Sequence, residues 1–467
     1  MPSIGFQAIR KCTPKRTPRR NRQLEYMIRY AFAFLFLPII GLVMVSAQSP
    51  DHTVSQPKQA ELEYAPAPAD NPMRGLVPYV SEPNKARFPH SMEFCYFSLK
   101  ELMPAPDSFD WAPIEKTLAE VSQRGNQLIF RVYCDYPSKP SGTPAFLIDA
   151  GVKLTRWTNP EDKVVSHSPD YENPIMRKAL TNFVAALGAT YDGDPRIAFI
   201  TAGLLGSWGE WHTYPKDELW ASKPVQREIM TAFTKAFSKT KILLRYPAGP
   251  ETYWHAENHA LPFGYHDDSF GWASLDTGNK KDDWFFEPAL KEAGATEKWK
   301  QHPIGGEIRP ELWKRSFTDK RHPKEQPFVD CVERLHASWL LDSGLFDKRF
   351  PLDEKRKATA LKETGRLGYE LHISKAIWKD GILSVTVQNR GVAPFYSDWP
   401  VELSLDGAVT PTPWKASKIL PGATSLWVVK TEPFEEVKIR IPNPMKGGKP
   451  LRFANTYQDD DWLVLPL

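Results

Sequence analysis

Short apolar runs alternate with amphipathic stretches through most of the chain. Apolar residues recur at spacings of three and four in the stretches 111–124, 174–190 and 224–237, which predicts three amphipathic helices. Strands that alternate with helices form a parallel sheet, and eight such units close into a (β/α)₈ or TIM barrel. The pattern therefore predicts an α/β barrel over residues 71–366, with buried strands in eight apolar runs: 75–80, 94–99, 128–133, 197–205, 242–246, 263–266, 303–308 and 337–341.

The pattern changes after residue 366. Apolar and polar residues then alternate one by one, and turn dipeptides such as Asp380-Gly381 and Asp406-Gly407 interrupt the alternation. This is typical of antiparallel strands with one buried face. The chain is therefore predicted to end in an antiparallel β-sandwich over residues 367–467.

An apolar segment at residues 31–47 follows a basic stretch and ends in the small-residue pattern Val-Ser-Ala. This is the pattern of a signal peptide over residues 1–47, with Met27 as an alternative start. An uncleaved anchor is the less favoured alternative, because Pro38 and Gly41 interrupt a run that is short for a membrane span. The protein is predicted to be secreted or periplasmic, without stable membrane insertion after cleavage.

Charge separates this N-terminal segment from the body of the chain. The whole sequence carries 60 Lys and Arg against 56 Asp and Glu, but eight of the basic residues lie in 1–47 with one acidic residue. The body is therefore slightly acidic and has no basic stripe, which argues against nucleic acid as a partner. Residues 48–70 are rich in Pro and Ala and are predicted to be a flexible tether.

Three of the four cysteines, Cys95, Cys134 and Cys331, lie outside the predicted signal peptide. Their spacing fits no zinc motif, so buried thiols are expected, with a Cys95–Cys134 disulfide as the alternative. The chain has no Gly-rich phosphate loop and no GxSxG nucleophile elbow. No cofactor and no metal are therefore predicted.

Two glutamates stand where a barrel places its chemistry, at the carboxyl ends of strands. Glu210 follows the fourth run in the sequence Gly-Ser-Trp-Gly-Glu-Trp-His, and Glu307 ends the seventh run after two glycines. Cleaving a glycosidic bond needs one protonated carboxyl that gives a proton to the leaving oxygen and one ionised carboxyl that attacks the anomeric carbon or activates water. The pair is therefore predicted to be catalytic; the alternative is a structural ion pair with a nearby arginine.

Two stretches resemble known families. The segment 97–132 resembles the second strand, loop and helix of the clan of retaining barrel glycosidases that includes the β-galactosidases. Residues 71–467 more closely resemble a bacterial family of unknown function whose chains open with Asn-Pro-x-Arg-Gly, here 71–75, and finish in a β-sandwich. The likeness to the clan rests on the matching places of Leu102, Pro104, Phe109, Asp110 and Trp111.

The resemblance to the glycosidase clan implies roles for the two glutamates. The clan's acid/base ends strand four and its nucleophile ends strand seven, which implies Glu210 as acid/base, Glu307 as nucleophile, and retention of configuration. The clan has Asn before the acid/base, where this chain has Gly209. Carboxyls about 5 to 5.5 Å apart would fit retention, and a spacing of about 6.5 to 9.5 Å would fit inversion.

Other polar and aromatic residues near strand ends are predicted to contact a carbohydrate substrate. For each a structural alternative stands beside this prediction: salt bridges inside the barrel for the arginines, a solvated turn or helix cap for the aspartates, and core packing for the tryptophans. The predicted substrate-binding residues are Arg131, Tyr133, Trp208, Trp211, His212, Arg245, Tyr265, His266, Asp267, Asp268 and Trp339.

Two further alternatives stay open. His255 and His259 could share a helix face and bind a metal, although the intervening Glu257 fits no zinc-protease motif. The whole chain could also be a non-catalytic glycan-binding or cell-surface protein that keeps a glycosidase-like barrel, because a fold does not establish an activity. The first prediction remains an exported glycoside hydrolase.

Overall fold

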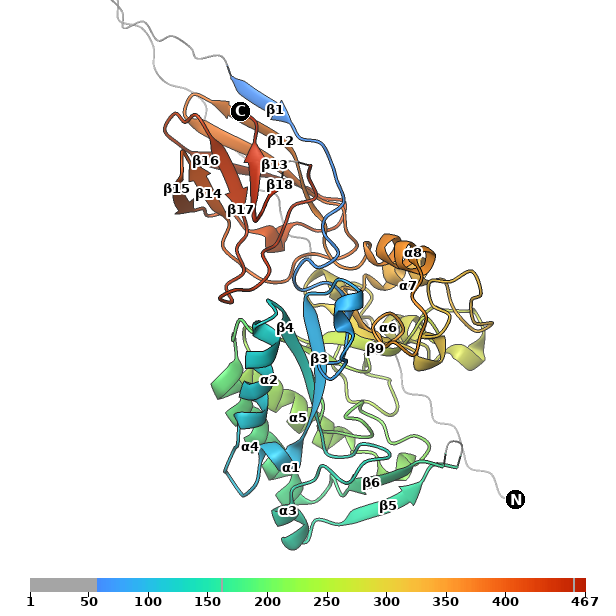
Figure 1. The fold of residues 1–467 in the computed structure, drawn as a ribbon. Helices are drawn as coiled ribbons and strands as arrows, with labels where there is room; N and C mark the ends of the chain where they lie inside the picture. The colour runs from blue at the N-terminus through green and yellow to red at the C-terminus, as the bar shows by residue number, and fades with distance from the viewer. Residues whose placement is uncertain (1–56, 161–162, 457) are drawn as a thin grey trace, which may run out of the picture. The chain divides into compact units, whose positions relative to one another are not determined.

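The central sheet of the structure consists of eight parallel strands. The structure is a computed structural model that describes residues 57–160, 163–456 and 458–467 (Figure 1). The strands are ordered β2-β11-β10-β9-β8-β7-β4-β3. The amides of Val80 and Phe94 join the two ends into a barrel, donating to Phe94 O at 2.8 Å and Pro78 O at 2.9 Å. Each strand falls on one predicted run, so the barrel is confirmed: β2 (Gly75–Val77), β3 (Met92–Ser98), β4 (Gln127–Tyr133), β7 (Ile197–Thr201), β8 (Lys241–Leu244), β9 (Gly264–Phe270), β10 (Ile304–Ile308) and β11 (Trp339–Leu341).

Helices cover the outside of the barrel, and the three predicted ones, α2, α4 and α5, are present. Asn173 begins α4 by accepting a hydrogen bond from the Ile175 amide at 2.9 Å, and Pro174 occupies the first turn, where no amide donor is needed. The long connection after β4 holds α3 and a hairpin of β5 (Leu154–Thr158) and β6 (Val165–Pro169). The helices are α1 (Leu99–Leu102), α2 (Ala112–Ser122), α3 (Ala145–Asp149), α4 (Pro174–Tyr191), α5 (Lys223–Ala236), α6 (Phe286–Glu292), α7 (Phe328–Leu335) and α8 (Glu354–Thr364).

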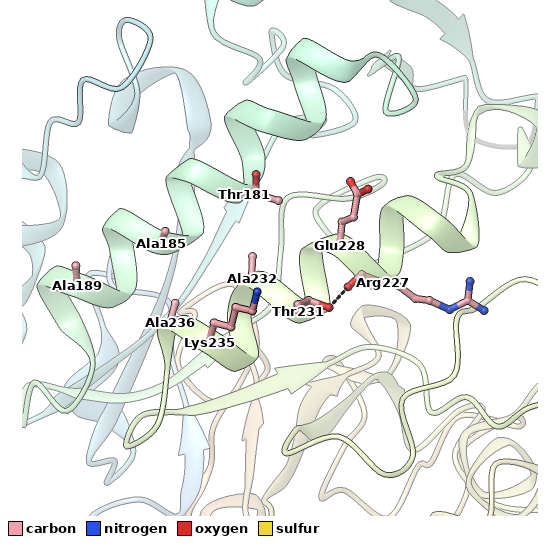
Figure 2. Close-up of a pocket in the computed structure, with 9 residues that line it drawn as sticks. All are labelled: Thr181, Ala185, Ala189, Arg227, Glu228, Thr231, Ala232, Lys235 and Ala236. Atoms are coloured by element: carbon pink, nitrogen blue, oxygen red, sulfur yellow. Dashed lines mark hydrogen bonds between the residues drawn. The ribbon is translucent and has the colours of Figure 1, made fainter.

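Helices α4 and α5 lie side by side on the outside of the barrel, with a groove of about 630 Å³ between them (Figure 2). Gly188 of α4 lets the helices approach, because a Cβ there would lie 2.4 Å from the Ala236 carbonyl oxygen. Small side chains such as Ala185 and Ala232 line the groove. None of the predicted site residues reaches it, so the groove is separate from the chemistry expected at the strand ends.

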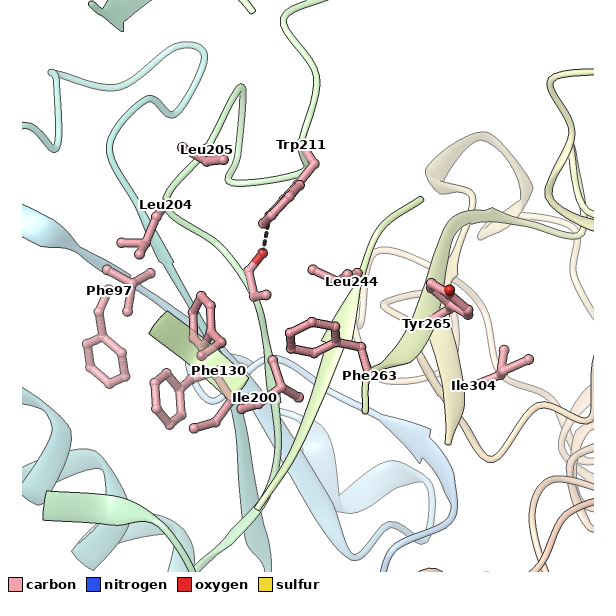
Figure 3. Packing of buried hydrophobic residues seen from close by; sticks show 14 of the residues in the cluster. Phe97, Phe130, Ile200, Leu204, Leu205, Trp211, Leu244, Phe263, Tyr265 and Ile304 are labelled. Carbon is pink, nitrogen blue, oxygen red and sulfur yellow. Dashed lines mark hydrogen bonds between the residues drawn. The ribbon is translucent and has the colours of Figure 1, made fainter. Parts of the chain in front are cut away.

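Two apolar layers sit on opposite faces of the barrel sheet. The outer layer lies between the strands and the helices; Figure 3 shows Phe130, Ile200 and Leu244 gathered there. The inner layer holds the alternate side chains, such as Phe94 and Leu243. Side chains two apart on a strand share a face, so this division fixes which polar residues point into the barrel.

Two antiparallel sheets follow the barrel, which confirms the predicted β-sandwich. Their buried side chains, such as Val385 and Ile439, belong to one hydrophobic cluster that also contains Phe199 and Trp339 of the barrel. The first sheet is ordered β1 (Lys58–Glu61), β12 (Leu371–Lys379), β13 (Ile382–Asn389), β16 (Thr424–Lys430), and the second β15 (Ala408–Pro411), β14 (Glu402–Leu405), β17 (Val437–Arg440), β19 (Trp462–Leu465), β18 (Gln458–Asp459).

Part of the predicted tether is ordered. Strand β1 pairs antiparallel with β12, with Lys58 opposite Trp378 and Glu61 opposite Lys375. The Lys375 ammonium lies 2.9 Å from the Glu61 carboxylate. The prediction of a tether over the whole of 48–70 is therefore wrong for residues 58–61, which form an edge strand.

The Asn-Pro-x-Arg-Gly motif ties the barrel to the sandwich. The Asn71 side chain donates to Arg452 O at 2.8 Å and accepts from the Arg452 amide at 3.1 Å. Arg74 Nη1 donates to Tyr369 O at 2.7 Å, and the Tyr369 hydroxyl donates to Pro72 O at 2.8 Å. Asn71 and Arg74 are buried, so this motif is structural and takes no part in the strand-end chemistry.

The alternative of a Cys95–Cys134 disulfide is wrong. All three described cysteines are free thiols. Cys95 of β3 lies opposite Phe130 of β4, and Cys134 comes four residues later. At roughly 3.3 Å per residue the two backbones are therefore about 13 Å apart along the strands, beyond the reach of a disulfide.

The predicted signal peptide, residues 1–47, lies outside the described residues, as does the start of the tether. Within the described residues, no helix is both long enough and apolar enough to cross a membrane.

Candidate functional site

Alternation along the barrel strands decides which polar side chains reach the barrel interior. On β8, Ile242 and Leu244 pack in the outer layer, whereas Leu243 belongs to the inner layer. Arg245, two positions after Leu243, therefore lies on the interior side at the carboxyl end of the strand. The same alternation brings to that end Tyr96 of β3, Arg131 of β4, Thr201 of β7, His266 and Asp268 of β9, and Glu307 of β10.

The guanidinium of Arg131 joins several of these side chains. Its Nη1 donates to Glu210 Oε1 at 3.2 Å, and its Nη2 donates to Asp268 Oδ2 at 2.9 Å. Its Nε donates to Thr201 Oγ1 at 2.9 Å. His266 Nδ1 lies 2.8 Å from the second oxygen of Asp268. We call these five residues the Arg131 cluster; because Arg131 and Asp268 are only 2% and 5% exposed, their charges depend on each other.

The pKa values in the Arg131 cluster follow from burial and from neighbouring charges. Burial alone would lower the pKa of Arg131, but Asp268 and the other acidic neighbours raise it above its usual value. Burial alone would raise the pKa of Asp268, but Arg131 and His266 outweigh that and lower it. Burial lowers the pKa of His266 to about 4. At neutral pH the cluster therefore holds a guanidinium, an ionised Asp268 and a neutral imidazole.

The buried imidazole of His266 predicts a loss of stability in acid. The folded protein binds this proton near pH 4 and the unfolded chain binds it near pH 6.5, so the unfolded chain holds more protons between these values. The stabilisation is therefore complete above about pH 6.5 and is lost as the pH falls towards 4, by up to about 3 kcal/mol. Urea unfolding at pH 7 and pH 4.5 should show this difference, and His266→Gln should reduce it. An equal difference in the variant would remove His266 as the cause.

A tight turn positions Glu210 after β7. The Glu210 amide donates to Ser207 O at 2.9 Å, and the Ser207 amide donates to His212 O at 2.8 Å, which closes the loop. Trp208 and Trp211, on either side of Glu210, both have positive φ angles, 55° and 59°. Non-glycine residues rarely adopt this conformation, and such strain concentrates at functional sites. The turn holds the Glu210 side chain, 15% exposed, against Arg131, with His212 Nε2 3.5 Å from its other oxygen.

Gly209 departs from the glycosidase clan for a structural reason. Its φ is 71°, and a Cβ there would lie 3.1 Å from both Gly203 Cα and the Val132 carbonyl oxygen. An asparagine at this position would need the turn to move. The amide side chain that the clan has at this position therefore has no counterpart at residue 209.

Glu307 lies at the rim of the barrel that the carboxyl ends of the strands form, and its carboxyl group has no bonded partner in the described part of the chain. No hydrogen bond or ion pair to its carboxyl is found within the described part of the chain. Burial raises the pKa of Glu307 well above its usual value, and the negative charges of Asp268 and Glu210 raise it further. Arg131 acts in the opposite direction without overcoming them. Glu210 is therefore near enough to Glu307 for its charge to raise the pKa of Glu307. We call these two residues the carboxyl pair.

The glycines before Glu307 allow β10 to pack closely. A Cβ at Gly305 would lie 2.1 Å from the Trp339 ring, and a Cβ at Gly306 would lie 2.1 Å from the Asp267 carbonyl oxygen. Gly306→Ala should therefore lower the free energy of unfolding by about 1 to 3 kcal/mol, because a backbone atom cannot move aside cheaply. Urea unfolding checks this against Gly365→Ala, whose Cβ would meet nothing closer than 3.2 Å. Equal stability of the two variants would contradict the packing argument.

Three predicted substrate contacts lie in the core instead. The buried Tyr265 packs in the outer layer, where its hydroxyl donates to Asn258 Oδ1 at 2.8 Å. Trp211, 3% exposed, donates from Nε1 to Ala202 O at 2.5 Å. Trp339, 1% exposed, lies in the inner layer beneath Gly305. Core packing therefore accounts for the positions of Tyr265, Trp211 and Trp339, and their substrate contacts stay predictions.

Asp267 and Asp268 lie within β9, so the alternative of a solvated turn is wrong. Asp267 accepts from the Ser274 hydroxyl at 2.6 Å and from the Ser269 amide at 3.0 Å. Both aspartates are buried, and their hydrogen bonds are internal to the protein. Arg245 is 6% exposed and lies 3.8 Å from Asp267. These contacts make the aspartates structural supports of the rim.

The predicted contacts that remain half-exposed are Tyr133, Trp208 and His212. His212 lies 6.1 Å from the Trp208 ring and 6.3 Å from the Tyr246 ring, measured between ring centres. These rings surround the Glu210 side of the rim, where aromatic faces can stack on a sugar.

The sequence did not reveal three tyrosines near the carboxyl pair. The pKa values of Tyr79, Tyr96 and Tyr136 are raised first by burial and then by neighbouring charges that include both glutamates. Tyr96 also accepts from Arg131 Nη1 at 3.4 Å. Its place two residues after the inner-layer Phe94 is a signal that could have identified it.

The alternative of a metal site at His255 and His259 loses its basis, because residues 251–263 form no helix. The His255 ring instead stacks on Tyr246 with ring centres 4.4 Å apart. In the part of the chain that the structure describes, no three His, Cys, Asp or Glu side chains are grouped so that they could hold one metal ion.

No family model and no curated protein matches the chain, so the resemblances drawn from the sequence stay predictions. Several solved structures are similar to this chain at low identity. Endo-glycoceramidase II from Rhodococcus sp. is 11% identical with a TM-score of 0.41, and the match covers 79% of this chain and all of that one. A GH5_18 protein from Bifidobacterium longum subsp. infantis is 13% identical with a TM-score of 0.37, covering 60% and 73%. An alpha-amylase from Geobacillus thermoleovorans is 8% identical with a TM-score of 0.34, covering 79% and 97%. Likeness at this level does not indicate what this chain acts on.

Proposed function

We propose that this chain is a glycoside hydrolase that cleaves a poly- or oligosaccharide with Glu210 and Glu307 as its working carboxyls. The observation that carries the proposal is the contrast between their surroundings. Glu210 contacts the Arg131 guanidinium at 3.2 Å, whereas burial and anionic neighbours raise the pKa of Glu307. Two nearby carboxyls whose environments favour opposite protonation states are what acid-assisted hydrolysis of a glycosidic bond requires.

The chemistry divides between a protonated and an ionised carboxyl. The protonated one gives its proton to the leaving oxygen while the ionised one attacks the anomeric carbon, and water then releases the sugar. The resemblance to the retaining clan supports retention of configuration. It also implies Glu210 as acid/base and Glu307 as nucleophile, an assignment that the charges around the two carboxyls oppose. The half-exposed Tyr133, Trp208 and His212 would contact the sugar at the rim.

The test is a hydrolysis screen of the purified protein against a broad panel of polysaccharides and aryl glycosides. The proposal expects release of sugar or aryl alcohol from at least one substrate by the wild type and none by the Glu210→Gln/Glu307→Gln double variant. Equal release by both proteins, or no release from any substrate, would contradict it.

One observation favours a second candidate, a non-catalytic glycan-binding protein. Glu210 is already held by Arg131, as in a purely structural ion pair. That candidate expects the double variant to bind polysaccharides as the wild type does, with no hydrolysis by either protein.

We also propose that the enzyme is exported. The basic stretch, the apolar run 31–47 and the Val-Ser-Ala pattern support this. N-terminal sequencing of the protein recovered outside the cytoplasm should begin close to Gln48, and an intact N-terminal segment would contradict cleavage.

A further inference from the structure

The roles that the glycosidase clan implies do not match the charges around the carboxyl pair. In the clan the strand-four carboxyl brings the proton to the bond and the strand-seven carboxyl is the ionised nucleophile. Here the strand-four carboxyl, Glu210, touches a guanidinium, and the strand-seven carboxyl, Glu307, touches no cation among the described residues.

We infer that Arg131 reverses the roles that the clan implies for the carboxyl pair. It holds Glu210 as the ionised carboxylate and leaves Glu307 as the group that carries the proton. This inference rests on the proposed function only for its catalytic meaning. The position of the proton is a property of the free protein.

The contacts of Arg131 support the first half of the inference. Its Nη1 donates to Glu210 at 3.2 Å, and a guanidinium binds an ionised carboxylate more strongly than a protonated one. The His212 Nε2 atom lies 3.5 Å from the other Glu210 oxygen. When this nitrogen bears a hydrogen, it also favours the ionised form of Glu210. The remaining donors of Arg131 face Thr201, Asp268, the Tyr96 hydroxyl and the His266 ring, so none is left over for Glu307.

The surroundings of Glu307 support the second half. Asp268 is ionised, because Arg131 and His266 outweigh its burial and lower its pKa. An ionised Glu307 would therefore face Asp268 and Glu210 without a cation of its own, in a site where burial already disfavours charge. The titratable and charged groups that act on Glu307 or feel its charge are Tyr79, Tyr96, Arg131, Tyr136, Glu210, Asp268 and Asp342.

The reaction balances with the roles reversed. The Glu307 carboxylic acid gives its proton to the glycosidic oxygen as the bond from that oxygen to the anomeric carbon breaks, and a Glu210 oxygen forms the new bond to that carbon. Water then attacks the same carbon and gives its proton to the Glu307 carboxylate, which frees Glu210. Arg131 is a positioning residue in this scheme, since it holds Glu210 and takes no part in the bonds that form and break.

The experiment is infrared spectroscopy of the free protein at neutral pH, in the carbonyl region where protonated carboxyls absorb separately from ionised ones. The inference expects Glu307→Gln to lose one protonated-carboxyl band relative to the wild type, and Glu210→Gln to lose only ionised-carboxylate intensity. Glu311→Gln is the matched control at the same rim. Glu311 is paired with Arg309 at 2.7 Å, which helps to lower its pKa, so this variant should also lose only ionised intensity.

Arg131 itself is tested by removing its charge. Arg131→Met should add protonated-carboxyl intensity, and the further change Glu210→Gln should remove the part that belongs to Glu210. Any part that remains belongs to Asp268, which also loses its cation. Arg131→Lys keeps a cation beside Glu210 and should retain the wild-type spectrum, which keeps the test usable if the methionine variant folds poorly. A merely structural arginine would change the stability of the protein and leave the spectrum as it is.

Loss of the protonated band in Glu210→Gln instead of Glu307→Gln would overturn the inference and restore the clan's roles. If neither variant loses a protonated-carboxyl band relative to the wild type, the inference is overturned as well. Neither spectrum involves a substrate, so failure of the inference is distinct from failure of the hydrolysis screen. With an active substrate in hand, Glu307→Gln should still release a first burst of dinitrophenol from dinitrophenyl glycosides, whose leaving group needs no proton. The missing base should then slow release of the sugar, and Glu210→Gln should show no burst.

Discussion

Replacing Glu307 by Gln should reduce hydrolysis of substrates with poor leaving groups by about 10² to 10⁴-fold while the melting temperature stays close to that of the wild type. The amide cannot give up a proton as the carboxylic acid does, and general acid catalysis contributes about this factor. Stability should persist because Glu307 has no hydrogen bond or ion pair to lose among the described residues. Steady-state kinetics and thermal unfolding of the same preparations measure both effects.

The control for this change is Glu311→Gln, which alters a carboxyl of the same rim outside the carboxyl pair. It should keep the wild-type kcat/KM. Wild-type activity of Glu307→Gln on an unactivated glycoside would remove Glu307 from the mechanism. A large fall in melting temperature would instead show that the structure depends on a contact of Glu307.

Replacing Arg131 by Met should lower the free energy of unfolding by about 3 to 5 kcal/mol. The change leaves Asp268 and Glu210 without their cation, and removing one partner of a buried ion pair costs this much because the other charge stays buried. Urea unfolding at pH 7 measures the loss. A loss of less than about 1 kcal/mol, which is typical of an ion pair at the surface, would contradict the buried role of Arg131.

A further change, Asp268→Asn, shows whether the lost stability comes from an unpaired charge or from lost packing in the Arg131 cluster. In the Arg131→Met background it should restore part of the lost stability, because the amide needs no cation. Equal and additive losses from the two changes would contradict a direct interaction across the 2.9 Å contact.

The barrel could be predicted from the sequence because its strands are short apolar runs between helices of clear periodicity. The edge strand β1 could not be predicted, since its residues Lys58–Glu61 are polar and largely exposed. Its pairing comes from backbone hydrogen bonds to β12, and these leave no pattern in the side chains.

The candidate site was predictable in its positions and less so in its contacts. Selecting residues near strand ends identified Glu210, Glu307 and Arg131, but it also selected Tyr265, which faces the helices. Alternation along β9 separates the two faces and would have rejected Tyr265. The pairing of Arg131 with Glu210 joins residues 79 positions apart, and only the closure of the barrel brings them together.

The central claim is that Glu210 and Glu307 work as one unit on one glycosidic bond, and a double-variant cycle on an active substrate tests it most directly. The effects of mutations within one catalytic unit on activity are strongly non-additive. The Glu210→Gln/Glu307→Gln protein should therefore be no more than about tenfold less active than the less active of the two single variants. Losses that multiply, or a single variant with full activity on an unactivated glycoside, would contradict the claim.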